Sequence, residues 1–187
     1  MPEFFSKSDN VAMGILNTAE DDAEGNSLAG AILYEPFGDV EADASKLEVS
    51  ASEPISAMMT TCRSRFLFAL QERNPSLTEE QRASLKCGYI GWMAVHSSQR
   101  RKGICLTLVQ QATREMALAG MSFIIAYCTS PKSRAVFLKA GYEVWAEVRY
   151  ATFQVRENKY PGGEFPYRNV PDEVSIMVKD LRHALND

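Results

Sequence analysis

The stretch Val95-His-Ser-Ser-Gln-Arg-Arg-Lys-Gly-Ile-Cys-Leu-Thr-Leu-Val109 decides the fold of this 187-residue chain. An apolar segment at residues 89–95 leads into a short basic loop, and a helical pattern starts directly after Gly103. The first turn of a helix offers unpaired backbone N–H groups and the positive end of the helix dipole. A glycine at this point lets an anion approach the backbone closely. Three consecutive basic residues add positive charge: Arg100, Arg101 and Lys102. The stretch therefore predicts a loop that binds a pyrophosphate group.

The loop differs from the common nucleotide-binding loops. A P-loop ends in Gly-Lys-Ser/Thr, whereas Gly103 is followed by Ile104 and Cys105, and the dinucleotide fingerprint needs three glycines. The loop instead follows the pattern Arg-x-x-Gly-x-small residue, with Arg100, Gly103 and Cys105 in the three defined positions. This pattern resembles the phosphate loop of the GNAT superfamily of acyl-CoA-dependent N-acyltransferases, which reads Arg/Gln-x-x-Gly-x-Gly/Ala. Cys105 departs from the last place but is still small, so we expect reduced backbone freedom there rather than a lost site.

A second block supports the same resemblance. Residues 123–127 (Phe-Ile-Ile-Ala-Tyr) form a short apolar run that is typical of a buried strand. In the polar stretch that follows, Ser130 can cap a helix, Pro131 can take its first position and Gly141 can end it. The superfamily carries a similar block of strand, Asn or Ser, helix and Gly-Phe/Tyr in the same order along the chain.

The composition is that of an ordinary globular chain, with 45% hydrophobic and 24% charged residues. The length suits one domain over residues 1–187. A net charge of −4 and a pI of about 5.3 argue against a nucleic-acid partner. No apolar run approaches the length of a membrane span, so no membrane partner is expected.

Cysteine and histidine usage argues against a metal site. The four cysteines contain no Cys-x-x-Cys pair, and only His96 and His183 could join them as ligands. No signal peptide precedes the cysteines, so reduced thiols in a cytoplasmic protein are the simple interpretation. The cysteines are Cys62, Cys87, Cys105 and Cys128.

Hydrophobic periodicity predicts an alternation of strands and helices. Strands are predicted at residues 10–16, 27–34, 87–95, 123–127, 144–155 and 174–178. Helices are predicted at residues 55–71, at 76–85 through a capping box of Ser76 and Glu79, after Gly103 with a core-facing stripe of Ile104, Leu108, Ala112 and Met116, and at 131–139. This order predicts an α/β (α+β) fold, a GNAT-like three-layer sandwich with a mixed, mostly antiparallel central sheet flanked by helices.

The beginning of the chain is short for the superfamily. GNAT domains usually start with a strand and two helices, whereas only about nine residues precede Asn10 here. Three interpretations are open: these elements are missing, another segment replaces them, or the first strand of the pair begins elsewhere than at Asn10. Because the early helices line the acceptor pocket in the superfamily, the helix at 55–71 is expected to do so in this chain.

The resemblance implies an N-acetyltransferase that moves an acetyl group from acetyl-CoA to a primary amine of a small molecule or protein by direct attack. Backbone groups of the strand before the loop would bind the pantetheine arm, and a backbone N–H near Met93 or Ala94 would serve the thioester oxygen. The implied cofactor-binding set is Met93, Ala94, Val95, Arg100, Arg101, Lys102, Gly103, Ile104, Cys105, Ser130, Ser133 and Phe137.

The catalytic acid and base that other members of the superfamily use are missing from their usual positions in this sequence. The tyrosine with which many members protonate the leaving thiolate corresponds to Phe137, and the glutamate that some members carry on the strand corresponds to Tyr89. The part of the chain from about residue 128 to 181 resembles the insect-type arylalkylamine N-acetyltransferases, which also lack that tyrosine. Ser130 and Ser133 are therefore the catalytic candidates in this block.

Two further residues are candidates for the base. Glu35-Pro36-Phe37 is similar to a Glu-Pro-Leu run that carries the catalytic glutamate of that subfamily. Because a predicted strand enters it, Glu35 would stand at a strand end on a different element, and a turn residue is the alternative. His96 can titrate near neutral pH, but the superfamily often has Val-His-Pro here with the side chain away from the amine, so a structural role is expected.

Several alternatives remain open. The missing tyrosine and glutamate also suit a non-catalytic acyl-CoA-binding or regulatory module, which would release no free thiol with an amine. The acceptor would be chosen by variable loops at residues 35–54, 73–86 and 159–170. A late pair of strands could pair across a homodimer.

Overall fold

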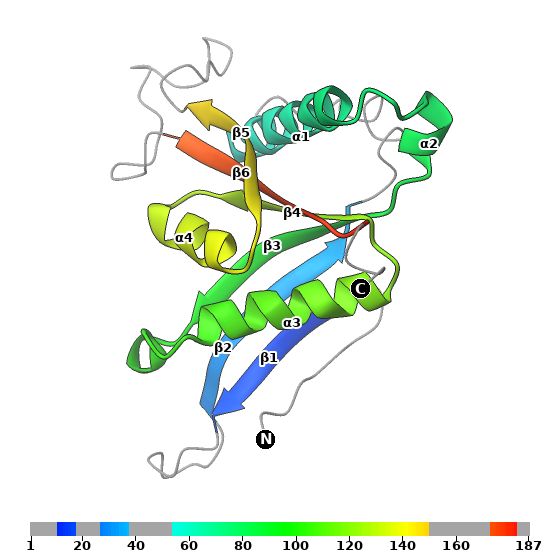
Figure 1. Cartoon of the computed structure of the whole chain (residues 1–187). Coiled ribbons are helices and arrows are strands. Elements are labelled where there is room, and N and C mark those ends of the chain that lie inside the picture. Colours follow the sequence, from blue (N-terminus) through cyan, green and yellow to red (C-terminus); the bar gives the residue numbers. More distant parts are fainter. Residues whose placement is uncertain (1–10, 18–26, 38–53, 150–172, 183–187) are drawn as a thin grey trace, which may run out of the picture.

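The computed structural model describes residues 11–17, 27–37, 54–149 and 173–182. They form a six-stranded sheet with helices on both faces (Figure 1). The strands are β1 (Val11–Asn17), β2 (Ser27–Pro36), β3 (Cys87–Val95), β4 (Phe123–Cys128), β5 (Glu143–Arg149) and β6 (Glu173–Asp180). The helices are α1 (Pro54–Arg73), α2 (Glu79–Ala83), α3 (Ile104–Leu118) and α4 (Pro131–Lys139), with a short 3-10 turn at Ser97–Gln99.

The sheet has the strand order β1-β2-β3-β4-β6-β5. Strands β3 and β4 run parallel, and the other four neighbouring pairs are antiparallel. The parallel pair needs a crossover, which the loop and α3 supply, and α3 lies across β2 and β3 in Figure 1. The predicted sandwich with a mixed, mostly antiparallel sheet is therefore confirmed.

The two faces of the sheet are covered by different helices, and alternation along β4 shows this. Phe123 and Ile125 pack in a cluster with α1, whereas Ile124 and Ala126 pack in a cluster with α3 and α4. Side chains at successive strand positions point to opposite faces. An unbroken apolar strand such as β4 is therefore covered on both sides, as its sequence predicts.

Strand β6 is also buried on both faces, which its sequence pattern did not reveal. Val174, Ile176 and Val178 face α1, while Met177 belongs to the cluster of α3 and α4. The alternation in the sequence predicted only the burial of Val174, Ile176 and Val178. β6 lies between β4 and β5 and is contacted by both α1 and α4, so its central residues 174–178 are buried on both faces.

The predicted start of α2 needs correction. The capping box of α2 is not Ser76 with Glu79: the Thr78 hydroxyl accepts from the Gln81 N–H at 3.2 Å, and the Gln81 side chain accepts from the Thr78 N–H at 2.9 Å. Ser76 lies inside a turn closed by the bond from the Leu77 N–H to the Asn74 carbonyl. Strand β5 is described as far as Arg149, and the remainder of the predicted strand, like residues 10 and 159–170, lies outside the described residues.

In the part of the chain that the structure describes, no helix is both long and apolar enough to cross a membrane.

Candidate active site

Strands β3 and β4 pair along only part of their lengths. Their register runs from the pair Cys87 and Phe123 to the pair Ile90 and Ala126. Beyond this point β3 continues to Val95 and β4 to Cys128 without pairing to each other. Backbone groups on the facing edges of the two strand ends therefore lack a ladder partner from the neighbouring strand, which leaves them available to a bound molecule.

A bulge at Gly91 lies next to the point where β3 and β4 stop pairing. Leu33 of β2 pairs with Trp92, and the next residue, Tyr34, pairs with Ile90, so Gly91 is an extra residue in β3. Such a bulge bends the strand and increases its twist. A methyl group on Gly91 would lie 3.1 Å from the ring of Tyr89, so the position favours glycine. The sequence feature that could have predicted this bulge is the isolated Gly91 within an apolar strand pattern.

A cavity of about 710 Å³ lies at the divergence. Its lining comes from both faces of the sheet, since Tyr89 and Tyr127 pack with the α1 cluster while Ile90 and Phe137 belong to the cluster of α3 and α4. The gap between the strands thus joins the two faces. The described lining residues are Glu35, Met58, Met59, Cys62, Tyr89, Ile90, Gly91, Trp92, Met93, Ala126, Tyr127, Cys128, Thr129, Ser130, Ser133, Phe137 and Val174.

The loop between β3 and α3 has the backbone of an anion site. Gly103 is the N-cap of α3 with φ +80°, and no side chain caps the helix. The N–H groups of Ile104 and Cys105, in the first turn, have no intrahelical acceptor. Arg101 also has a left-handed φ of +67°, which is uncommon for a residue with a side chain and often marks a functional site. A methyl group on Gly103 would meet nothing within 4 Å, so space for a ligand lies beside it.

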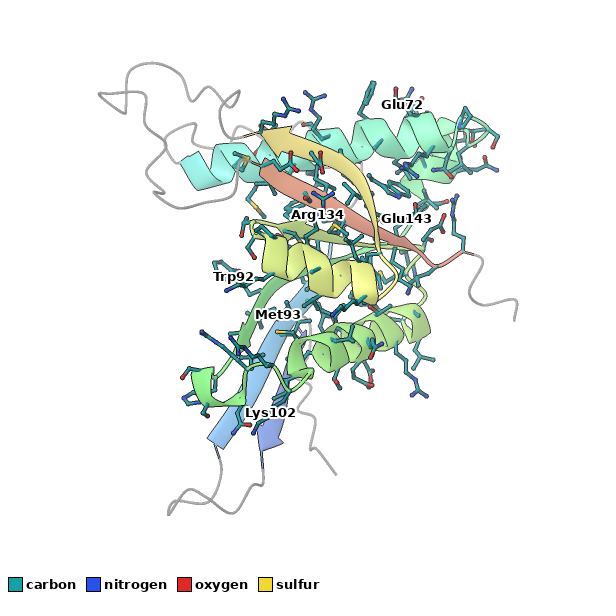
Figure 2. The ribbon with its side chains drawn as sticks, turned by 60° about the vertical axis from the view of Figure 1, so that its left-hand side comes forward. Glu72, Trp92, Met93, Lys102, Arg134 and Glu143 are labelled. Carbon is teal, nitrogen blue, oxygen red and sulfur yellow. The ribbon has the colours of Figure 1, made fainter. Side chains whose placement is uncertain are left out.

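The basic side chains of this loop are exposed. Lys102 donates to Gln99 at 2.7 Å, and Figure 2 shows it in the loop that precedes α3. His96 is exposed as well and contacts the Ser98 hydroxyl at 2.8 Å. It is not among the described residues that line the cavity, and its structural role stays a prediction.

The N-terminus of α4 forms one wall of the cavity. Ser130 caps the helix by accepting from the Ser133 N–H at 3.1 Å, and the two hydroxyls lie 3.0 Å apart. Burial raises the pKa of the neighbouring Cys128 thiol to about 11, although a hydrogen bond with Ser133 acts in the opposite direction. Cys128 is therefore a neutral, buried thiol near pH 7.

The opposite wall is aromatic. The rings of Tyr89 and Tyr127 lie 5.1 Å apart, and Glu35 pairs across the strands with Tyr89. Burial, more than any neighbouring charge, raises the pKa of both phenols well above the usual value. The Tyr127 hydroxyl is buried and makes no hydrogen bond with the described residues. An unpartnered buried hydroxyl is uncommon and requires a reason.

The structure brings together some of the predicted site residues. Met93, Ser130, Ser133, Phe137 and Glu35 all line the cavity, and Glu35 lies within β2 rather than in a turn. Ala94, Val95 and the predicted loop residues do not line it. They continue from the cavity along β3 to the N-terminus of α3. Phe137 is also a core aromatic, in edge contact with Tyr142.

Sequence reasoning missed part of the lining. Trp92 and Tyr127 received no role because each occurs in an apolar strand, where a core position is the ordinary interpretation. The helix at 55–71 does line the cavity through Met58, Met59 and Cys62 of α1. Among the described residues, no group of histidine, cysteine and acidic side chains could hold a metal ion.

Comparison with known proteins agrees with this geometry. Residues 61–142 match the sequence profile of the Acetyltransferase (GNAT) family. A search of curated proteins gives no sequence match. The fold is similar to that of a polyamine N-acetyltransferase of Drosophila melanogaster that forms N-acetylagmatine, with a TM-score of 0.62 and 17% identity over 91% of this chain and 74% of that chain.

Two further solved structures share the fold. A mosquito arylalkylamine N-acetyltransferase like 5b has a TM-score of 0.61 and 21% identity, over 88% of this chain and 73% of that chain. NAA60 of Arabidopsis thaliana, solved in complex with acetyl-CoA, has a TM-score of 0.57 and 10% identity, over 94% of this chain and 78% of that chain. At these identities, the similarities establish a common fold.

Proposed function

We propose that this chain, in which residues 61–142 match the Acetyltransferase (GNAT) family, transfers an acetyl group from acetyl-CoA to a primary amine by direct attack. The observation that carries the proposal is the cavity that joins both faces of the sheet at the point where β3 and β4 stop pairing. An acyl donor and an acceptor can reach such a cavity from opposite sides and meet between the strands.

The residues present suit the donor. The unpaired edge of β3 at Met93, Ala94 and Val95 offers amide groups to a pantetheine arm. The N-terminus of α3 offers N–H groups and a positive dipole end to a pyrophosphate, and the open space beside Gly103 would admit it. The exposed side chains of Arg100, Arg101 and Lys102 add positive charge at the same end. Acetyl-CoA would supply the acetyl group in activated form, as a thioester.

Residues on the two walls suit the two proton transfers. The amine nitrogen forms a bond to the acetyl carbon as the carbon–sulfur bond breaks. The nitrogen loses a proton, which Glu35 would accept directly or through water, because it is the only charged side chain among the described residues of the lining. The leaving thiolate gains a proton, which the hydroxyl of Ser130 or Ser133 on the α4 wall would donate. A backbone N–H near Met93 would stabilise the charge that develops on the carbonyl oxygen.

One observation favours a second candidate, a non-catalytic acyl-CoA-binding module. Phe137, at the place of the usual tyrosine, is buried and has no proton to give, and Tyr89 replaces the glutamate of other members. A thiol-release assay separates the two functions. With acetyl-CoA and a panel of primary amines, the proposed enzyme releases free CoA in proportion to acetylated amine. Binding of acetyl-CoA without thiol release from any amine would support the module instead.

The location of the protein in the cell and its oligomeric state stay predictions. A cytoplasmic location is supported by the four cysteines, all of which are free thiols. A homodimer is suggested only by the late strands, and sedimentation of the full chain would test it.

A further inference from the structure

We propose that the cavity continues beneath α1 as a channel for the acyl group of the donor, and that the protein therefore prefers acyl-CoA thioesters of butyryl to hexanoyl length over acetyl-CoA. The acyl channel is formed by Met58, Cys62, Tyr127 and Val174, which all line the cavity on the side of the α1 cluster. This inference deepens the proposed function and rests on it, because it names the class of donor.

The strand order shows how far the cavity extends. The strands that stop pairing are β3 and β4, and β6 is the next strand beyond β4. Val174 of β6 lines the same cavity, so the cavity crosses β4 on the face that α1 covers. With neighbouring strands about 4.8 Å apart, the middle of the gap and β6 are separated by about 7 Å. An extended chain with carbon–carbon bonds of about 1.5 Å covers this distance with about six carbons.

The walls of the channel come from one helix and two paired strands. Met58 and Cys62 are one helical turn apart, so they lie on the same face of α1, and that face packs on the sheet. Tyr127 of β4 is directly opposite Ile176 of β6, and Val174 is its diagonal neighbour towards the start of β6. Figure 1 shows α1 next to β5 and β6, which it contacts. The channel therefore lies between α1 and the pair β4 and β6.

The channel is apolar and shielded from water. Met58, Cys62 and Val174 are all buried, although each borders the cavity. The only oxygen or nitrogen atom among the four side chains is the Tyr127 hydroxyl, which is buried as well. Because this hydroxyl is already removed from water, a hydrocarbon chain that covers it adds little desolvation cost. Apolar cavities of this kind bind apolar groups.

The geometry of a thioester directs its acyl chain into the channel. The carbonyl carbon has three substituents in one plane. In the proposed reaction the sulfur faces Ser130 and Ser133 on the α4 wall, and the oxygen faces the N–H near Met93 of β3. The acyl chain leaves in the third direction, away from both, which is across β4 and beneath α1. The amine attacks perpendicular to this plane, so a longer chain does not block it.

Calorimetric titration with acetyl-CoA, butyryl-CoA and hexanoyl-CoA tests the channel. Each methylene that becomes fully buried strengthens binding by a factor of about four. Hexanoyl-CoA is therefore expected to bind at least about tenfold more tightly than acetyl-CoA, with butyryl-CoA between the two. Equal affinities for the three thioesters would overturn the inference.

Two variants place a longer side chain in the channel. Cys62→Met, from the helix, should reduce the preference for hexanoyl-CoA to about twofold or less and change the affinity for acetyl-CoA little. Val174→Met should do the same from β6, and it serves if Cys62→Met does not fold. Ala69→Met is the matched control, since Ala69 is buried on α1 two turns further along but is not among the described lining residues. The control should lose stability and keep the preference. An unchanged preference in the folded channel variants would overturn the inference.

Turnover separates failure of the channel from failure of the proposed function. Thiol release is measured for acetyl-CoA and hexanoyl-CoA with a panel of primary amines. If hexanoyl-CoA binds with the expected preference but no amine releases thiol, the channel stands and the transferase function falls. If acetyl-CoA turns over but longer acyl groups gain no affinity, the channel is wrong and the function stands. If Cys62→Met raises the KM for the amine and not for hexanoyl-CoA, the space holds the acceptor and the inference is overturned.

Discussion

Ile90 and Ala126 form the last residue pair between the parallel strands β3 and β4. One residue further along β3, Gly91 bulges out of the ladder with β2. The two irregularities therefore occur together, at the cavity that both strand ends line. Strands β3 and β4 are hydrogen-bonded to each other up to this pair and separate beyond it. The site therefore has paired strands on one side and backbone groups without a partner in the neighbouring strand on the other.

The glycine at the start of α3 should matter for acetyl-CoA and little else. Gly103 and Gly120 both have left-handed φ values, of +80° and +78°, and neither has an atom within 4 Å of an added methyl group. Substitution by alanine therefore strains both to a similar extent, by about 1–2 kcal/mol. We expect Gly103→Ala to weaken acetyl-CoA binding at least tenfold in calorimetric titration, because its methyl group enters the space assigned to the pyrophosphate.

Gly120→Ala is the matched control for that experiment. It lies beyond the opposite end of α3 and should lose stability without losing affinity. Equal affinities of the two variants for acetyl-CoA would show that the pyrophosphate does not lie at the N-terminus of α3.

Removal of the Glu35 charge should slow the reaction. A general base contributes a factor of about 10² to 10⁴, so Glu35→Gln should lower kcat/KM for the best amine by about a hundredfold. Glu72→Gln, which changes an exposed carboxylate near the end of α1 (Figure 2), should leave the rate within a factor of about two. Unchanged turnover of Glu35→Gln would remove Glu35 from the chemistry.

Arg134 connects α4 to the strands beside it. Its Nη1 lies 3.0 Å from Glu147 of β5 and 3.2 Å from Glu173 of β6, all three side chains being partly exposed. Glu173→Gln should lower the free energy of unfolding by about 0.5–1 kcal/mol, less at high salt. Glu143→Gln breaks a more exposed pair with Arg73, at 3.4 Å, and should cost less. Urea titrations in low and high salt would measure both, and the reverse order would contradict a role for Arg134 in fixing α4.

The buried thiols predict how stability depends on pH. Burial raises the pKa of Cys62 to about 12 and that of Cys128 to about 11, from 9.0. The folded chain thus holds these protons more tightly than the unfolded chain. The resulting stabilisation is complete below pH 9 and is lost as the pH rises towards the folded pKa, at up to about 1.4 kcal/mol per pH unit for each thiol.

The variant Cys128→Ala isolates one of these contributions. Its free energy of unfolding should fall less steeply between pH 9 and 11 than that of the unmodified chain, since one titrating group with a raised pKa is gone. Two parallel curves over that range would show that Cys128 is not shielded from solvent.

Local patterns account for the features that the sequence predicted well. The loop before α3 and the cap at Ser130 depend on residues a few positions apart, whose chemistry is visible in the sequence. The position of Glu35 depends instead on its register with Tyr89, more than fifty residues away along the chain. Tyr89 and Trp92 lie on the same face of the sheet because Gly91 is an extra residue in β3. A regular alternation of faces along the strand does not predict this. Burial of β6 on both faces depends on helices from distant parts of the sequence.

The most direct test of the central claim is the melting temperature of the full chain with and without saturating acetyl-CoA. A ligand that binds only the folded state adds about 2.7 kcal/mol at a hundred times its Kd, which corresponds to a rise of roughly 5–10 °C for a domain of this size. We expect this rise with acetyl-CoA and with desulfo-CoA, and none with ATP. No rise with acetyl-CoA would contradict the assignment of the donor site to β3 and the N-terminus of α3.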